Sequence, residues 1–148
     1  MTPVELSHSK IVYDLQNSEQ IFQKVGDGII TKNPALVPTV TVADCVPIYL
    51  YDEVTKVFGI VHSGWKGTGI IKEAIMLAKQ KYGSAPSDFC VVIGPHINDC
   101  CYVVNEERAT YFAKEFTSDC VKPISKNQKI DWNNGEGQLF SLSLLCQI

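Results

Sequence analysis

The strongest constraint on the fold comes from residues 39–71. This stretch contains two runs that are rich in β-branched and aromatic residues, and a polar turn at residues 52–55 separates them. Such runs favour β-strands. Each run carries one side chain that can bind a metal ion, Cys45 in the first and His62 at the end of the second. The stretch therefore predicts a β-rich centre and the beginning of a metal site.

The two runs differ in how clearly they predict strands. Residues 56–62 predict the cleaner strand, because their side chains alternate between two faces and His62 shares a face with large apolar neighbours. Residues 37–51 predict one or two strands, interrupted near Cys45 by Pro47. We expect this interruption to turn the Cys45 side chain toward a pocket.

A glycine-rich turn and a helix follow the second run. Residues 63–69 hold three glycines, after which apolar residues recur at helical spacing, with Thr68 as the predicted N-cap and Gly83 as the predicted end. Residues 89–93 predict another strand, and residues 105–116 a second amphipathic helix. This order predicts an α+β fold, a layered α/β sandwich with a mixed β-sheet and flanking helices.

The length of the chain favours one domain. A chain of 148 residues, 45% of them hydrophobic, can bury a single core, so we expect residues 1–148 to form one domain. Residues 139–148 are apolar up to the last position. Because an exposed apolar end is unfavourable, we expect a longer natural sequence, or a cover from another segment or from a second subunit in a homo-oligomer.

Charge and hydropathy restrict the partners. With 13 basic and 16 acidic residues and a formal charge of −3, the chain has no electrostatic signature of a nucleic-acid-binding protein, which favours a small-molecule partner. The sequence has neither a long apolar run nor a basic leader, so we expect no membrane span and a cytoplasmic location. In that reducing compartment the six cysteines are expected to be thiols. The adjacent Cys100 and Cys101 could bond to each other only with strained geometry.

Three residues form a candidate metal site: His8, Cys45 and His62. Thiolate and imidazole are ligands that zinc prefers, and three protein ligands with one open position are typical of catalytic zinc. Such a zinc ion activates water or polarises a leaving group. The alternative is that each histidine is an ordinary core or surface residue, and spacing alone favours that alternative.

The glycine-rich turn is a candidate anion site. Backbone N–H groups at the start of a helix, with Lys66 beside them, can hold a phosphate. The alternative is that the glycines only form a tight turn and that Trp65 belongs to the core. Asp44 could act as a general base, could orient a histidine, or could simply cap a turn.

A nucleophilic role for the same residues is a second hypothesis. Cys45 would be the attacking thiolate and His62 its base, as in a cysteine hydrolase. Cys90 and Cys120 have no place in either hypothesis, and we expect them to be small buried apolar side chains.

Three sequence blocks resemble a known family. These are Ala-Asp-Cys-Val-Pro-Ile at residues 43–48, Val-His-Ser-Gly-Trp-Lys-Gly at 61–67, and Ile-Gly-Pro at 93–95 followed by Cys-Cys-Tyr at 100–102. They are similar to the signature blocks of the laccase-domain family, also called the peptidoglycan-editing-factor or multifunctional purine nucleoside phosphorylase family. The family's first zinc ligand is a histidine in an upstream block, which residues 6–12 resemble around His8.

The resemblance implies a zinc enzyme that cleaves purine nucleosides with phosphate and also deaminates adenosine. It implies substrates of the adenosine, inosine and methylthioadenosine class, zinc ligation by His8, Cys45 and His62, and catalytic roles for Asp44 and Lys66. It also implies that the nucleoside and the phosphate contact Ser63, Gly64, Trp65, Lys66, Gly67, Cys101 and Tyr102. A role in editing cell-wall precursors follows only from one of the family's names.

The chain departs from the family pattern at several points. Lys66 replaces the usual arginine, which keeps the positive charge but loses the bidentate fork, and Val103 replaces a glutamate. Family members usually extend further at both ends, with segments that have no counterpart in this sequence. Two alternative functions therefore remain: a copper-dependent polyphenol oxidoreductase, for which two histidines and a cysteine are suitable ligands, and a non-catalytic fragment that binds zinc without turnover.

Overall fold

The computed structural model describes residues 1–124 and 140–142. The chain forms two compact units, residues 1–96 and residues 97–148. The first unit contains β1 (Thr2–Pro3), β2 (Val12–Asp14), the 3-10 helix η1 (Ser18–Ile21), β3 (Gly28–Thr31), β4 (Pro38–Thr39), β5 (Val46–Asp52), β6 (Phe58–Ser63), α1 (Ile70–Tyr82), the 3-10 helix η2 (Pro86–Asp88) and β7 (Phe89–Ile93). One domain over residues 1–148 stays a prediction, and most of the apolar end at residues 139–148 lies outside the described residues.

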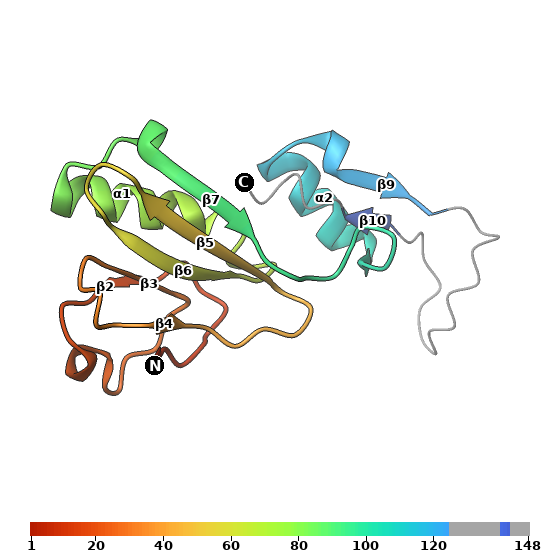
Figure 1. Ribbon diagram of the computed structural model, residues 1–148. Helices are drawn as coiled ribbons and strands as arrows, with labels where there is room; N and C mark the ends of the chain where they lie inside the picture. Colours follow the sequence, from red (N-terminus) through yellow and green to blue (C-terminus); the bar gives the residue numbers. More distant parts are fainter. Residues whose placement is uncertain (125–139, 143–148) are drawn as a thin grey trace. The chain divides into compact units, whose positions relative to one another are not determined.

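A five-stranded mixed sheet forms the centre of the first unit, in the order β2-β3-β6-β5-β7. β2 and β3 are parallel and all other neighbours are antiparallel. Figure 1 shows α1 lying along this sheet, where it packs against β2, β3 and β6. The predicted mixed sheet with a flanking helix is therefore confirmed.

The sheet is covered on both faces near β3. Ile29 and Ile30 point to opposite faces because side chains alternate along a strand, and both are fully buried. Ile29 packs with Val4, Leu15 and Leu36 from the N-terminal segments, while α1 packs on β3 from the other face. This packing holds the N-terminal segment that contains His8 against the sheet that contains His62.

The helix α1 follows its predicted pattern, with one difference at its start. Ile70, Ile71, Ala74 and Ala78 are its buried residues, and Gly83 ends it in the left-handed conformation, with its N–H donating to the Lys79 carbonyl. The N-cap is Gly69, also left-handed with φ 84°, and not Thr68. Thr68 lies one residue before the cap, and its hydroxyl is directed at the carbonyls of Gly64 and Trp65 (both 3.1 Å), where it closes the preceding turn.

Pro47 lies inside β5, whereas the sequence predicted that it would interrupt a strand. Its carbonyl accepts a hydrogen bond from the N–H of Gly94 (2.8 Å), just beyond the end of β7. The nitrogen and the carbonyl of a strand residue point to the same side, so the missing N–H of Pro47 faces a position where β7 has already ended. The strand therefore begins one residue before Pro47, directly after Cys45.

Asp52 closes the turn between β5 and β6. Its buried carboxylate accepts hydrogen bonds from the N–H groups of Val54 and Thr55 (2.8 and 2.9 Å) and from the Thr55 hydroxyl (2.6 Å). Burial alone would raise the pKa of Asp52, but hydrogen bonds from Ser84, Thr55 and the backbone lower it to about 2. The ionised carboxylate therefore stabilises the turn.

Replacing Asp52 with alanine is expected to lower the free energy of unfolding by about 2 kcal/mol near neutral pH, because buried donors lose their acceptor. The folded pKa lies below the usual value of 3.8, so the stabilisation is present above that value and is lost as the pH falls toward about 2. Urea unfolding of both proteins at neutral and acidic pH measures the effect. A difference between them that stays constant with pH would contradict the role of the charge.

The second unit contains β8 (Val103–Val104), α2 (Glu106–Glu115), the 3-10 helix η3 (Ser118–Cys120), β9 (Val121–Pro123) and β10 (Phe140–Leu142). Its strands form an antiparallel sheet in the order β8-β10-β9, and α2 packs against β9 and β10. The predicted helix is confirmed with the N-cap Asn105, whose side chain accepts from the N–H of Arg108. Ala109 and Phe112 form its buried stripe.

The cysteines follow the predictions only in part. Cys45, Cys90, Cys100 and Cys101 are free thiols, as expected. Cys120 is buried, as predicted, but it is disulfide-bonded, so the prediction of a thiol there is wrong. Cys90 is exposed and not buried, because it lies with Val92 on the face of β7 that is open to solvent, while the residue between them faces the other way.

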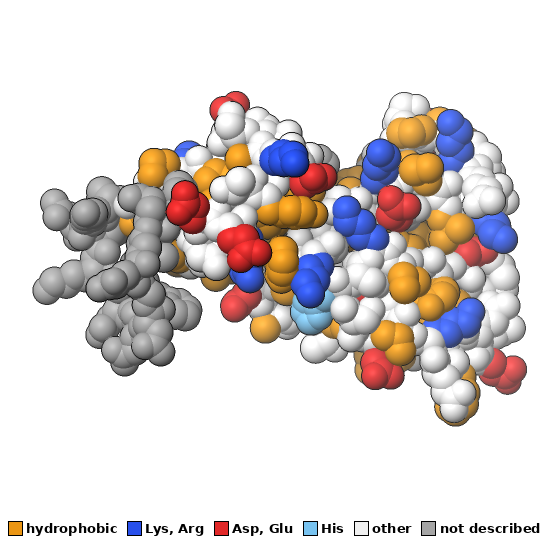
Figure 2. All heavy atoms as spheres, turned by 180° about the vertical axis from the view of Figure 1, so that it is seen from behind, with side chains coloured by type: hydrophobic (Ala, Val, Ile, Leu, Met, Phe, Trp, Pro, Cys, Tyr) orange, Lys and Arg blue, Asp and Glu red, His pale blue; other side chains and the backbone are white. Residues whose placement is uncertain are grey.

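The face of the molecule shown in Figure 2 has no dominant charge. On the face shown in Figure 2, acidic and basic side chains are interspersed among apolar ones. None of the helices in the described ranges combines the length and the apolar character needed to cross a bilayer.

Candidate metal centre

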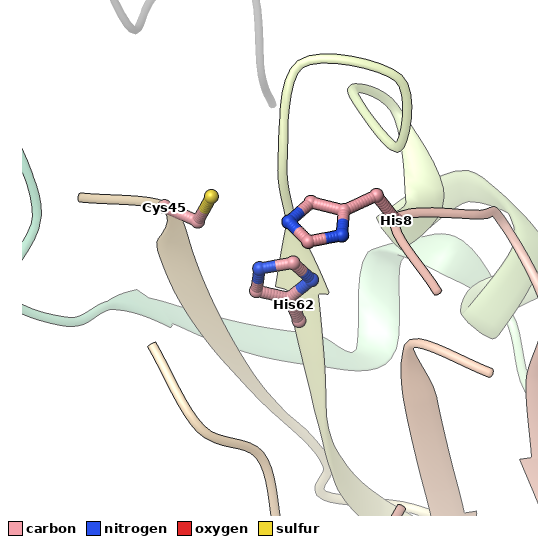
Figure 3. Close-up of side chains that lie close together, drawn as sticks. All are labelled: His8, Cys45 and His62. Atoms are coloured by element: carbon pink, nitrogen blue, oxygen red, sulfur yellow. The ribbon is translucent and has the colours of Figure 1, made fainter. Parts of the chain in front are cut away.

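His8, Cys45 and His62 converge in the first unit. One possible ligand atom from each lies within 4.8 Å of those from the other two. The two imidazole rings are 5.0 Å apart between centroids and nearly perpendicular, at 82°. Figure 3 shows the rings and the thiol facing a common space, with Cys45 directly before β5 and His62 on β6. The structure thus brings together the three residues that the sequence grouped.

Strand register explains why Cys45 and His62 meet. Pro47 on β5 pairs with His62 on β6, so both point to the same face of the sheet. Cys45 lies two residues before Pro47, in the bend that leads directly into β5, and its sulfur comes close to the ring of His62. His8 comes from a segment far away in the sequence and needs a separate anchor.

Asp27 is that anchor, and the sequence analysis missed it. Its fully buried carboxylate accepts hydrogen bonds from the N–H groups of His8 (2.9 Å) and Ser9 (2.6 Å) and from the hydroxyls of Ser7 (3.1 Å) and Ser9 (2.6 Å). It also lies 2.9 Å from Nδ1 of His62. One side chain therefore fixes both histidines of the cluster.

The contact with Asp27 selects the tautomer of His62. Asp27 is ionised, since hydrogen bonds from Ser9, His62 and Ser7 hold its pKa below the usual value although burial would raise it. An ionised carboxylate only accepts hydrogen bonds, so His62 donates its Nδ1–H to it. Nε2 is then left with its lone pair toward the cluster, and a carboxylate behind a histidine is typical of metal sites.

Asp27 also stabilises an unusual backbone conformation at His8. His8 has φ 57°, in the left-handed region that residues other than glycine rarely adopt. With that φ, the successive N–H groups of His8 and Ser9 both point at the carboxylate. The hydrogen bonds offset the local strain, which agrees with the tendency of strained residues to occur at functional sites.

Gly64 leaves the space that the cluster needs. A Cβ at this position would lie 3.0 Å from the His8 ring, 3.4 Å from the His62 ring and 3.5 Å from the Cys45 sulfur. A Cβ here would therefore press on the His8 ring and would lie in van der Waals contact with the other two residues. Gly67 has a similar role beside the His8 segment, because a Cβ there would lie 2.7 Å from the backbone oxygen of Ser9.

The chemistry of the donors fits a metal ion. Burial, together with the negative charges of Asp44 and Asp27, raises the pKa of the Cys45 thiol, which disfavours the free thiolate that the cysteine-hydrolase hypothesis requires. A bound cation would act in the opposite direction, because a coordinated thiol is deprotonated. The cluster is therefore better suited to ligating a metal than to nucleophilic attack.

The other predicted residues lie at different positions. Asp44 is exposed beside Cys45. Lys66 is exposed in the turn before α1, with its Nζ 5.5 Å from the Trp65 ring centroid. Ser63 follows His62 on β6 and so points to the opposite face, where it is buried and its Oγ meets no partner within the described part of the chain. Cys101 and Tyr102 belong to the second unit. Substrate contacts by these residues stay predictions.

Comparison with known proteins supports an enzyme family. A family described as multi-copper polyphenol oxidoreductase laccase matches residues 1–143. A purine nucleoside phosphorylase of Clostridium acetobutylicum is 39% identical over 127 residues, which cover 84% of this chain and 52% of that protein. A purine nucleoside phosphorylase of Borreliella burgdorferi is 34% identical over 141 residues, covering 93% of this chain and 60% of that protein.

Two further similarities bear on the activity and the fold. A protein named adenosine deaminase RL5, from an unknown prokaryotic organism, is 31% identical over 102 residues, 68% of this chain and 38% of its own length. The crystal structure of the Bacillus licheniformis hypothetical protein YfiH superimposes with a TM-score of 0.77 at 28% identity, covering 97% of this chain and 55% of that protein.

The matches to these two purine nucleoside phosphorylases thus span 52% and 60% of their lengths. The matched region includes all three residues of the His–Cys–His cluster. This chain belongs to the family described as multi-copper polyphenol oxidoreductase laccase, whose curated relatives include enzymes named purine nucleoside phosphorylase.

Proposed function

We propose that this chain provides the metal centre of a zinc-dependent purine nucleoside phosphorylase that also deaminates adenosine. The observation that carries the proposal is the convergence of His8, Cys45 and His62 within 4.8 Å. The names of the relatives support the two reactions. The partners are then a purine nucleoside and inorganic phosphate, and neither a nucleic acid nor a membrane takes part.

Zinc is the metal that the donors fit best. Two imidazoles and a thiolate are common zinc ligands, and three protein ligands leave a fourth position for water or substrate. When bound, zinc supplies Lewis-acid activation of water for deamination. Asp27 holds Nδ1 of His62, so Nε2 would be the nitrogen that binds zinc, and Gly64 leaves room beside the two histidine rings. Asp44, exposed next to Cys45, is the group that we assign to proton transfer.

The glycine-rich turn supplies the phosphate site in this proposal. Gly64, Trp65 and Gly67 bring the backbone close to the cluster, and the exposed Lys66 contributes the positive charge. A lysine neutralises phosphate as a point charge, without the bidentate hydrogen bonds of an arginine. A phosphate bound at this turn would lie close to Gly64, whose Cβ position is within 3.5 Å of His8, His62 and Cys45.

Replacing Lys66 with alanine is expected to raise KM for phosphate about tenfold or more, because a hydrogen bond to a charged group contributes roughly 1.5–3 kcal/mol. Phosphorolysis should fall much more than deamination. Replacing Lys66 with arginine should restore or lower KM for phosphate. Lys79, exposed in the last turn of α1, offers a matched control, since Lys79→Ala removes the same charge far along the helix. Equal effects of Lys66→Ala and Lys79→Ala would contradict the assignment.

The test of the proposed function is phosphate-dependent release of adenine from adenosine, followed with and without a zinc chelator. Ammonia release in the same samples reports deamination. We expect both activities to disappear with chelator and to return with added zinc. Bound zinc without either activity would support a non-catalytic zinc-binding fragment, and alkylation of Cys45 that zinc does not prevent would support the cysteine-hydrolase hypothesis.

Copper is a second candidate because the family description names it. Two histidines and a cysteine also bind copper. A multicopper oxidase requires more than one metal site, and the described residues contain a single group of suitable donors. Metal analysis of protein purified without chelator, paired with a phenol oxidation assay, distinguishes the two metals. Copper at full occupancy with phenol oxidation would overturn the zinc proposal.

A further inference from the structure

Cys100 and Cys101 are neighbouring cysteines in the second unit, and the proposed function gives their two thiols no joint role. Cys100 and Cys101 are both free and exposed, and their sulfur atoms lie 3.3 Å apart. The turn that presents them is fixed by its backbone: the N–H groups of Cys101 and Tyr102 both donate to the carbonyl of Asn98 (2.9 Å), and the N–H of Cys100 donates to the Asp99 carboxylate (2.9 Å). The two thiols are therefore presented together at the surface.

Backbone geometry disfavours a disulfide within this pair. The peptide bond between the two residues is trans, so their Cα atoms are about 3.8 Å apart. A disulfide usually has a Cα separation of roughly 4.4–6.8 Å and a sulfur–sulfur bond of about 2.05 Å, and a shorter Cα separation strains it. In addition, the hydrogen bond with Cys101 raises the pKa of the Cys100 thiol, so this thiol keeps its proton and is less readily oxidised.

The same spacing suits one atom that binds both sulfurs. A soft metal is held by thiolate sulfur at about 2.3 Å, so a single centre can bridge two sulfurs that are up to roughly 4.6 Å apart. The observed 3.3 Å lies within that limit. Sulfur ligands select soft, thiophilic centres over hard cations such as magnesium and calcium.

We propose that Cys100 and Cys101 form a dithiol site for a soft, thiophilic centre, the chemical class to which trivalent arsenicals and Cd²⁺ belong. The site uses no residue of the His8–Cys45–His62 cluster and does not depend on the proposed activity. Once the first thiol has bound, the second is already within reach, and this raises the affinity over that of either thiol alone.

Phenylarsine oxide is a suitable probe because its reaction is balanced without an oxidant. Each thiol loses its proton, two arsenic–sulfur bonds form, the arsenic–oxygen bond breaks, and the oxygen leaves as water. Arsenic stays trivalent throughout. The bridged adduct therefore increases the mass of the protein by the mass of the reagent minus one water. Attachment to a single thiol retains the oxygen and adds the full mass of the reagent, so intact-protein mass spectrometry distinguishes the two.

The experiment compares the wild-type chain with Cys100→Ser, Cys101→Ser, Cys90→Ser and Cys45→Ser, each freed of reductant. We expect one bridged adduct on the wild type, released by a competing dithiol but not by a monothiol. Cys100→Ser and Cys101→Ser should each weaken binding about 100-fold or more, as expected when one of two linked contacts is lost. Cys90 is an exposed single thiol and Cys45 belongs to the metal cluster, so their variants should bind like the wild type.

Three outcomes would overturn the proposal. The first is no bridged adduct on the wild-type chain. The second is equal affinity of the wild type and Cys100→Ser. The third is loss of the adduct in Cys45→Ser or Cys90→Ser. Circular dichroism of each variant shows whether it is folded, and we expect the serine variants to fold because both cysteines are exposed.

Discussion

A chain in which His8 is replaced with asparagine is expected to lose zinc and both activities while it keeps its fold. The side chain of His8 is exposed, so little packing is lost. Asparagine tolerates the left-handed conformation of this position better than alanine does, and its N–H can still donate to Asp27. The variant therefore removes a ligand and leaves the backbone anchor in place.

The expected loss of zinc affinity is about 100-fold or more. Zinc sites with four protein ligands bind with about 10–16 kcal/mol, so one ligand contributes roughly 3 kcal/mol. Competition with a colorimetric zinc chelator measures the affinity, and thermal unfolding without metal measures the fold. His96→Gln is the matched control, since His96 is the remaining histidine and bonds through Nδ1 to the Gly94 carbonyl outside the cluster. If the His8→Asn variant bound zinc with unchanged affinity, His8 would not be a zinc ligand.

Replacing His62 with alanine also removes a proposed zinc ligand, but this side chain is buried, so the change affects stability as well. His62 is only 2% exposed, and its removal leaves the carboxylate of Asp27 without one of its buried donors. We expect both zinc binding and stability to fall. A His62→Ala protein that kept its zinc and its adenosine turnover would disprove the proposed function.

Local patterns could predict much of this site. The alternation in residues 56–62 predicted β6 and a face for His62, and the β-rich run before it predicted β5 close to Cys45. Gly83 correctly marked the end of α1 because a left-handed helix end is a local property. His8 was grouped with the other two residues only by its ligand chemistry, and the family resemblance strengthened that grouping, since no local pattern links residues so far apart.

Asp27 was missed because its role exists only in three dimensions. It contacts His62 across 35 positions of sequence and the His8 segment across 18 to 20 positions. A signal was present: an acidic residue between two glycines, directly before a buried strand, is out of place unless it has buried partners. Thr68 was misassigned for a related reason, since its hydroxyl bonds backward into the turn and not forward into the helix.

The Asp27→Ala variant is expected to show the second large effect. Its buried carboxylate is the acceptor for the N–H groups of His8 and Ser9 and for Nδ1 of His62. Leaving such donors unpaired costs about 1–3 kcal/mol each when they are buried, so we expect the free energy of unfolding to fall by about 3 kcal/mol or more. Loss of the carboxylate behind a metal-binding histidine should also weaken zinc binding about 10- to 100-fold.

Asp27→Asn should lie between the wild type and Asp27→Ala. An amide oxygen at the position of Oδ1 can still accept from His8 and His62, but the amide nitrogen would face the N–H of Ser9, which is also a donor. NMR of the His62 ring nitrogens gives a readout that is independent of activity. We expect the Nδ1–H tautomer in the wild type and in Asp27→Asn, and a mixture of tautomers in Asp27→Ala.

The matched control is Asp52→Ala, which separates positioning from general stability. Asp52 is also a fully buried carboxylate that closes a turn, but it lies at the opposite end of β5 from Cys45. Its loss should lower the free energy of unfolding without changing zinc affinity or the His62 tautomer. If Asp27→Ala and Asp52→Ala weaken zinc binding equally, Asp27 merely stabilises the fold. If only Asp27→Ala weakens it, the carboxylate holds the two histidines in the geometry that zinc requires.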